Sequence, residues 1–291
     1  MRYRAPVSGA SKAVLVTGCS TGIGRATAER LARRGWTVYA SARRSESIKD
    51  LADTGCSLLT LDVADEKARR AAVAEVEANE GAVGALVNNA GFGLEGPVEE
   101  VPLDEWRSQF ETNLFGMVHL IQLVLPAMRR QGWGRIVNVS SVGGRLTFPG
   151  GGPYHASKHA VEAMSDALRY EVRPFGVRVS IIEPGIIKTK FGDRVVSTVT
   201  KYGGDGPYAE FSAGVATRTL GAYDGPMAMM AASPNAVARV IDRALRRRWP
   251  RPRYRVTVGA RMILATRAIT TDRGWDRVLC AAYPPPKPDG A

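Results

Sequence analysis

A tyrosine and a lysine four residues apart, Tyr154 and Lys158, form the pair of side chains best suited to proton transfer. On a helix, residues at this spacing share one face, so the phenol and the ammonium would lie in one pocket. A free phenol, with a pKa near ~10, is a poor base at neutral pH, but a neighbouring cation stabilises the phenolate and lowers that pKa. The pair could therefore move a proton to or from a substrate oxygen. The alternative interpretation is that Tyr154 and Lys158 are an exposed pair on a helix, because this spacing often occurs by chance.

A glycine-rich turn, TGCSTGIG, follows an apolar strand and opens a helix. Gly18, Gly22 and Gly24 remove side chains where the backbone would approach a pyrophosphate. The start of the helix behind them offers unpaired N–H groups and a favourable dipole. This context predicts a bound dinucleotide, and the alternative is a tight turn that needs glycine for steric reasons alone.

The end of the second expected strand, VYASAR, distinguishes between the two nicotinamide dinucleotides. An acidic side chain there would accept hydrogen bonds from a ribose 2′-OH and would repel a 2′-phosphate. The chain instead has Arg43 and Arg44, whose guanidinium groups can hold a phosphate bidentately. We therefore predict NADP(H) over NAD(H), with Arg43 as the main contact and with Ser41 or Arg44 assisting. The alternative is two solvated arginines.

Five motifs in order resemble those of the short-chain dehydrogenase/reductase family. They are TGxxxGIG, the NNAG that begins at Asn88, an asparagine in ETNLFG, a serine after the strand RIVNVS, and YxxxK. The resemblance covers about residues 12–190. It implies hydride transfer between a nicotinamide and a carbonyl or secondary alcohol. The arginine after the second strand and the segment RPRYRV resemble the hydroxysteroid and retinol dehydrogenase-like branch, which implies a bulky apolar substrate.

The resemblance also assigns roles to single residues. Tyr154 would be the general acid or base, Lys158 would also bind the nicotinamide ribose, Ser141 would hydrogen-bond the substrate oxygen, and Asn113 would hold a water in a proton relay. Ser140 is the alternative to Ser141 if the register is off by one, because strand side chains alternate faces. The residues expected to bind the cofactor are Gly18, Ser20, Thr21, Gly22, Ile23, Gly24, Arg43, Asp62, Val63, Asn89, Ala90, Gly91, Tyr154, Lys158, Pro184, Gly185 and Thr189.

Short apolar runs alternate with segments of helical period, which predicts an α/β fold with a doubly wound parallel sheet of the Rossmann type in one domain. Several strands are apolar without alternation, as expected when both faces are buried. The expected strands are 13–17, 37–41, 57–61, 85–88, 135–140, 178–183 and 254–258. The expected helices are 22–34, 65–79, 104–130, 153–173, 234–248 and 260–269.

The chain beyond the core, 12–190, divides into two further parts. The segment 184–233 shows few clear periods and is expected to be an irregular substrate loop. Its Met227, Met229 and Met230 would line an adaptable apolar pocket or pack in the core. Residues 234–291 form a C-terminal extension that ends in a disordered PPPKPDG tail.

Composition limits the classes of function. The chain has three cysteines without close spacing, which argues against a disulfide framework. It has no cluster of His, Cys and Asp residues that would suggest a metal site. No uncharged apolar run of about 18 residues and no export signal are found, so we expect a cytoplasmic protein without a spanning segment. The net charge of +12 fits a solvated basic face in the last third of the chain. A nucleic-acid or membrane-surface module is the alternative, and salt-sensitive binding would favour it.

Further expectations concern partners and neighbouring residues. The partner is a small-molecule carbonyl or alcohol, with no nucleic acid bound. The long helices 104–130 and 153–173 resemble the pair that this family packs into a four-helix bundle, which predicts a homodimer or homotetramer. His155, His159 and Cys19 are expected to have structural roles. A non-catalytic NADP(H)-binding sensor or scaffold is the alternative function, and the intact reactive residues favour the enzyme.

Overall fold

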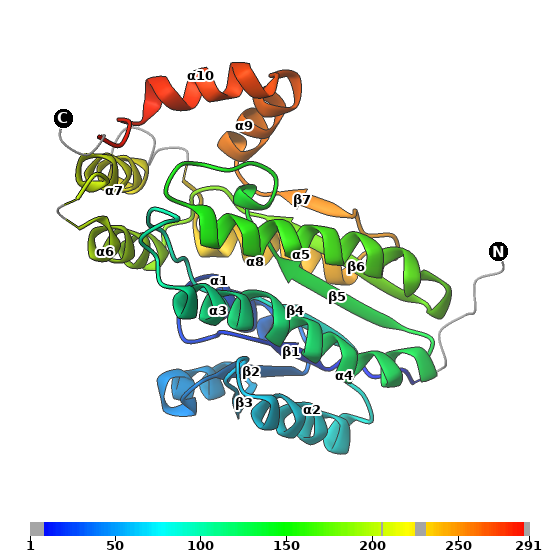
Figure 1. Cartoon of the computed structure of the whole chain (residues 1–291). Coiled ribbons are helices and arrows are strands. Elements are labelled where there is room, and N and C mark those ends of the chain that lie inside the picture. Colours follow the sequence, from blue (N-terminus) through cyan, green and yellow to red (C-terminus); the bar gives the residue numbers. More distant parts are fainter. Residues whose placement is uncertain (1–8, 205, 225–230, 288–291) are drawn as a thin grey trace.

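A parallel sheet of seven strands forms the centre of the computed structural model, which describes residues 9–204, 206–224 and 231–287 (Figure 1). The strand order is β3-β2-β1-β4-β5-β6-β7, and each strand runs parallel to its neighbours in the sheet. The strands are β1 (Val14–Val16), β2 (Val38–Ala42), β3 (Cys56–Thr60), β4 (Ala85–Asn88), β5 (Gly134–Val139), β6 (Val177–Glu183) and β7 (Arg253–Arg255). The predicted fold class, a doubly wound α/β sheet in a single domain, is confirmed.

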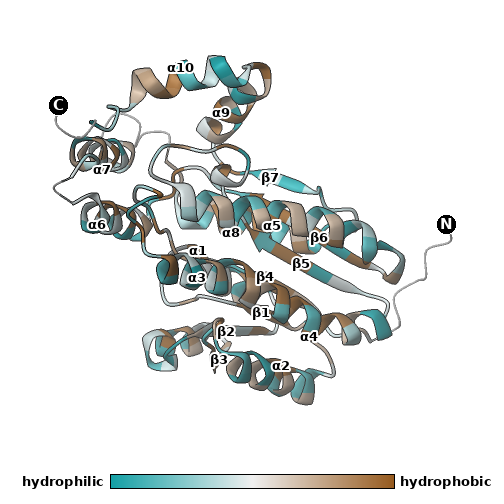
Figure 2. Ribbon diagram, viewed as in Figure 1, coloured by the Kyte–Doolittle hydropathy of each residue, from teal (hydrophilic) through white to brown (hydrophobic). Residues whose placement is uncertain are grey.

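Helices cover both faces of this sheet. One face carries α1 (Gly22–Arg33), the 3-10 helix η1 (Ser45–Thr54) and α8 (Pro234–Arg246), and the other carries α2 (Glu66–Glu80), α4 (Gly116–Arg130) and α5 (Gly152–Glu171). Leu15 packs into one core while Val14 and Val16 pack into the other, because successive strand residues face opposite sides. Figure 2 shows the result: β1 is hydrophobic in colour, whereas the edge strand β7 is hydrophilic.

The strand order reverses between β1 and β4, the position at which doubly wound sheets bind ligands. The turn after β1 and the segment after β4 meet there, because the strands are parallel and their carboxyl ends lie at one edge. Thr17 joins the two segments by donating its N–H to Val87 O at 3.0 Å. The glycine-rich turn is thereby placed at the mouth of the crevice.

The helix expected over 104–130 consists of three pieces. α3 (Leu103–Phe110) runs into a single π-helical stretch, η2 (Glu111–Phe115), and then into α4. A π-helical turn takes one residue more than an α-helical turn, and such turns are frequent at functional sites. Asn113 lies inside it and is fully buried.

The prediction that 184–233 is irregular was wrong. It contains α6 (Phe191–Gly203) and α7 (Ala209–Asp224), which lie against each other (Figure 1). Glycine and threonine give this segment a weak helix propensity, but Val195, Val199 and Val215 bury together between the two helices. Tertiary packing therefore overrides the local signal. Met227, Met229 and Met230 lie outside the described residues.

The C-terminal extension adds an edge strand and two more helices. α8 begins with Pro234 at its first position after Ser233, as predicted, although Ser233 makes no side-chain cap bond. β7 pairs with β6, and α9 (Val258–Ile269) and α10 (Asp272–Ala282) follow it; α10 was not predicted. The short 3-10 helices are η3 (Val142–Gly144) and η4 (Arg173–Phe175).

The tail after α10 departs from the prediction of disorder over its described part, residues 284–287. Lys287 N donates to Pro207 O at 2.9 Å, and its ammonium pairs with Glu210 on α7 at 2.5 Å. This part of the tail is therefore attached to α7. In the described ranges, no helix has both the length and the apolar character needed to cross a bilayer.

Candidate active site

The glycine-rich turn is held by the residue that follows β4. Asn89 Nδ2 donates to Thr17 O at 2.9 Å and to Gly18 O at 3.2 Å. Gly18 and Gly22 have φ values of 73° and 60°, a region that other residues avoid. A Cβ on Gly24 would clash with Gly18 O. The turn thus needs glycine at all three positions, and its path depends on the side chain of Asn89.

The start of α1 fits a pyrophosphate. The N-cap residue Thr21 has an extended backbone, and its side chain makes no cap hydrogen bond. The first N–H groups of the helix are therefore left without a side-chain acceptor from the N-cap residue. Thr189 borders the glycine turn, because its methyl group lies 3.1 Å from a Cβ placed on Gly22. An anionic group could therefore bind at the start of α1.

Two residues near the turn are already engaged inside the protein. Cys19 is fully buried, its thiol contacts Val16 O at 3.3 Å, and burial raises its pKa to about 12. This supports the prediction of a packing role for Cys19. Ser41 is also fully buried and donates to Val16 O at 3.0 Å. The expectation that Ser41 assists phosphate binding is therefore not supported, because its hydroxyl points into the sheet.

Arg43 and Arg44 are exposed at the carboxyl end of β2. They line a shallow depression together with Ser45, Glu46, Ser47 and Thr60. Neither guanidinium has an ion pair or hydrogen bond with another residue of the described ranges. Two unpaired cations beside the dinucleotide turn fit an anionic group such as a phosphate.

The remaining cofactor candidates lie around the same edge. Asp62 follows β3, is partly exposed and accepts from Ala64 N at 3.0 Å, whereas Val63 is buried. Ala90 N donates to Thr17 Oγ1 at 3.0 Å, which ties the NNAG segment to β1. Gly91 opens toward the reactive residues, since a Cβ there would lie 3.8 Å from the Lys158 ammonium. The NNAG segment thus connects the cofactor turn with the reactive group.

Tyr154 lies in the first turn of α5 and is buried, with its ring centroid 5.3 Å from that of Phe191. Lys158 Nζ is 5.8 Å from the same ring centroid, so the two residues share a face as predicted. Burial raises the pKa of Tyr154 well above its usual value, and the nearby Ser141 hydroxyl only partly opposes this rise. The shift is opposite to the one expected from a neighbouring lysine, because desolvation dominates.

Lys158 is itself desolvated. Burial lowers its pKa to about 8, and Glu162, one turn further along α5, works against this shift. The ammonium donates to Val139 O, the last residue of β5, at 2.9 Å. This bond fixes the lysine between the sheet and Tyr154.

Asn113 is held by three hydrogen bonds. Its Oδ1 accepts from Phe92 N at 3.1 Å, and its Nδ2 donates to Phe92 O at 3.0 Å and to Ser157 Oγ at 3.2 Å. Ser157 in turn donates to Tyr154 O at 2.7 Å. Ser157 was not among the predicted site residues, because the sequence shows only a small polar residue inside YxxxK. It links the π-helical turn to the helix that carries Tyr154.

The two adjacent serines point to different places. Ser141 Oγ accepts from Gly143 N at 3.0 Å, and its hydroxyl lies near the phenol of Tyr154, whose pKa it lowers. The hydroxyl of Ser140 is buried on the side of Gly144 and Glu162. This geometry favours the predicted register, with Ser141 beside the phenol.

Other predicted residues have supporting positions. Pro184 O accepts from Val142 N at 3.0 Å, and Gly185 packs against Thr257. His155 Nδ1 accepts from Phe148 N at 3.2 Å, and burial lowers its pKa to about 4. A neutral, bonded imidazole supports the predicted structural role.

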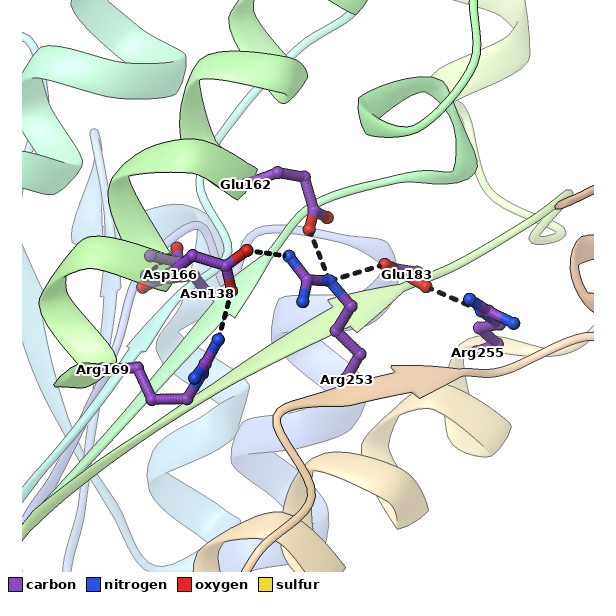
Figure 3. Close-up of polar contacts among 8 residues, drawn as sticks. Asn138, Glu162, Asp166, Arg169, Glu183, Arg253 and Arg255 are labelled. Atoms are coloured by element: carbon purple, nitrogen blue, oxygen red, sulfur yellow. Dashed lines mark hydrogen bonds and ion pairs between the residues drawn. The ribbon is translucent and has the colours of Figure 1, made fainter. Parts of the chain in front are cut away.

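An ion-pair network fixes α5 to the C-terminal extension (Figure 3). Arg253 Nε lies 2.9 Å from Glu162 Oε2 and 3.2 Å from Glu183 Oε1, and its Nη2 lies 2.6 Å from Asp166 Oδ2. Arg255 pairs with the second oxygen of Glu183 at 3.2 Å. The expectation of a solvated basic face therefore fails for Arg253, whose side chain is only 21% exposed.

Comparisons with known proteins agree with this arrangement. The family model described as short chain dehydrogenase matches residues 12–199. The chain is 37% identical over 270 residues to the uncharacterized oxidoreductase YbbO of Escherichia coli, covering 92% of this chain and 94% of that protein. It is 35% identical over 274 residues to an NADPH-dependent 3-dehydrocapnine reductase of Ornithobacterium rhinotracheale, covering 91% and 95%.

Among solved structures, a variant of actinorhodin polyketide ketoreductase with NADPH superposes with a TM-score of 0.72 at 31% identity. The match covers 87% of this chain and 98% of that one. The protein is accordingly an oxidoreductase that acts on CH–OH groups with NAD(P)(H). The chain belongs to the short-chain dehydrogenase/reductase family.

Proposed function

We propose that the protein uses NADP(H) to interconvert a carbonyl compound and a secondary alcohol, with Tyr154 as the proton donor or acceptor. The observation that carries this proposal is the convergence of Tyr154, Ser141 and Lys158 beside the glycine turn at the point where the strand order reverses. When bound, the cofactor supplies the hydride, and the protein supplies position and proton transfer.

The local environment of each reactive side chain suggests its role in the reaction. The raised pKa of Tyr154 keeps its phenol protonated at neutral pH, so it holds a proton for a carbonyl oxygen. The Ser141 hydroxyl beside it would hydrogen-bond the same oxygen. Lys158 would stabilise a phenolate left after transfer. Asn113 uses both Nδ2 hydrogens and one lone pair of Oδ1, so a relay water would be held by the second lone pair or by a main-chain group of the π-helical turn.

Arg43 is proposed to select NADP(H). Its unpaired guanidinium at the end of β2 supports this, as do the NADPH-dependent relative and the neighbouring structure with NADPH. Changing Arg43 to Asp is expected to reduce the NADPH/NADH ratio of kcat/KM by about 10- to 100-fold, because a charge-assisted phosphate contact becomes a repulsion. Arg277→Asp, on exposed α10, is the matched control. An unchanged ratio in Arg43→Asp would contradict the assignment.

A bulky apolar substrate, such as a steroid- or retinoid-like alcohol or ketone, is proposed on the basis of the residues beside Tyr154. Phe191 contacts its ring, and α6 and α7 bury an apolar cluster next to it. NADPH oxidation across ketones, aldehydes and quinones tests the function, with Tyr154→Phe as control. NADPH binding without turnover of any of these compounds would favour a sensor or scaffold.

A homodimer or homotetramer is also proposed. The face that carries α4 and α5 exposes several large apolar side chains in the described ranges, namely Phe115, Tyr170 and Phe175. Large apolar side chains exposed on one face favour association if they adjoin one another. Light scattering coupled to gel filtration is expected to give two or four times the chain mass, and Tyr170→Glu should lower it. A strict monomer at micromolar concentration would refute this proposal.

A further inference from the structure

Arg69 is a buried arginine that no step of the proposed reaction uses. It lies near the start of α2, which packs against α4, and is only 6% exposed (Figure 1). Its Nη1 donates to Val63 O at 2.5 Å and lies 3.4 Å from Glu111 Oε1, and its Nε donates to His119 Nδ1 at 2.9 Å. One guanidinium thus joins the loop after β3, the π-helical turn η2 and helix α4.

The acceptors around Arg69 suit a buried cation, which costs free energy unless hydrogen bonds and an opposite charge compensate it. The Nδ1 atom of His119 can accept only while it carries no proton. Burial and the nearby charges of Arg69 and Arg70 lower the pKa of His119, which favours that form at neutral pH. Glu111 supplies the opposite charge from a partly exposed position. The guanidinium is therefore held in one place.

The loop that Arg69 holds, residues 62–64, lies beside the end of β2. Leu61 N donates to Ala42 O at 2.8 Å, so the loop begins next to Arg43. The end of β2 is where a dinucleotide fold contacts the adenosine ribose. The loop 62–64 is therefore on the adenosine side of the crevice.

The position of this loop depends on few other polar contacts. Its further hydrogen bonds within the described part of the chain are local, such as that from Ala64 N to Asp62 Oδ1 at 3.0 Å. The carbonyl of Val63 also faces the start of α4, where a Cβ on Gly116 would lie 2.1 Å from its oxygen. Without Arg69, a carbonyl in this buried place would lose its donor, and the loop would have to shift to find another.

We propose that Arg69 is a positioning residue that holds the loop 62–64 in the shape that binds the adenosine half of the cofactor. The inference rests on the proposed function, because it places that half of NADP(H) between this loop and Arg43. Arg69 acts through the main chain of the loop. The nicotinamide half would lie beside Tyr154 and Lys158, which Arg69 does not contact, so the loss of Arg69 should weaken mainly the adenosine half.

Binding of adenosine 2′,5′-bisphosphate, measured by calorimetry, tests the inference without turnover. Arg69→Met keeps the aliphatic part of the side chain but removes every donor, and it should bind this ligand at least about 10-fold more weakly. Arg69→Lys keeps a cation that can bond to Val63 O but not to His119 as well, so its affinity should be intermediate. Arg70→Met should bind like the wild-type protein, because Arg70 is exposed and pairs with Glu66 at 2.8 Å.

A second control separates positioning from a general loss of stability. Arg253→Met removes a half-buried arginine that bonds to Glu162 and Glu183 and not to this loop, so it should keep the wild-type affinity for the bisphosphate. Wild-type affinity in Arg69→Met, or an equal loss in Arg253→Met, would overturn the inference. If Arg69→Met does not fold, wild-type affinity in Arg69→Lys would overturn it. The absence of binding by the wild-type protein would overturn it as well.

Steady-state kinetics distinguish this inference from the proposed function. In Arg69→Met, the KM for NADPH should rise by a larger factor than kcat falls. If carbonyl compounds are reduced and that KM is unchanged, the function stands and the role of Arg69 fails. If binding of the bisphosphate depends on Arg69 but no carbonyl compound or alcohol reacts, the reaction proposed at Tyr154 fails and the positioning role stands.

Discussion

Replacing Tyr154 with phenylalanine is expected to lower kcat by about 100- to 10,000-fold, the usual contribution of a positioned general acid or base. The ring that contacts Phe191 remains, and only the hydroxyl is lost, so neither the fold nor NADPH affinity should change appreciably. Single-turnover NADPH oxidation measures the loss, and fluorescence titration of NADPH measures binding. Retention of more than about a tenth of the turnover would show that another group transfers the proton.

The adjacent serines provide the control for the geometry around Tyr154. The Ser141 hydroxyl lies near the phenol, while the hydroxyl of Ser140 lies toward Gly144 and Glu162. Ser141→Ala should therefore reduce kcat about 10-fold or more relative to the wild-type protein. Ser140→Ala should retain most of the wild-type kcat. The reverse pattern would mean that the register of this segment around the substrate differs from the one proposed.

Local signals in the sequence were sufficient for the sheet and for most of the reactive group. Buried parallel strands are continuous apolar runs, so β1, β4 and β5 could be located from residue type alone. The glycine turn was visible because its steric requirement removes side chains at fixed spacing. Tyr154 and Lys158 could be paired because helical periodicity places them on one face.

Features that depend on contacts between distant segments could not be predicted in the same way. Helices α6 and α7 exist because Val195, Val199 and Val215 pack together, despite a glycine- and threonine-rich sequence. The raised pKa of Tyr154 follows from desolvation, which depends on the elements that cover the ring. Each of these properties belongs to the assembled fold.

Arg253→Met is expected to lower the free energy of unfolding by about 3 kcal/mol, the lower end of the range for breaking a buried ion pair. The substitution keeps much of the side-chain volume but leaves Glu162 and Glu183 without their shared cation, and both carboxylates are buried. Denaturant unfolding followed by circular dichroism measures the change. Arg255→Met is the matched control, with an expected loss below about 1 kcal/mol, because that arginine is 44% exposed.

The same substitution should also reach the reactive group through Glu162. That carboxylate is one turn from Lys158 on α5, and its charge works against the depression of the lysine pKa. Without Arg253, burial would favour the protonated, neutral form of Glu162. The negative charge that raises the pKa of Lys158 would then be lost, and that pKa would fall further. The pH profile of kcat should therefore shift toward lower pH in both Arg253→Met and Glu162→Gln. It should not shift in Arg255→Met. If Arg253→Met loses stability but keeps the wild-type pH profile, the role of the ion-pair network is only to hold β7 against α5.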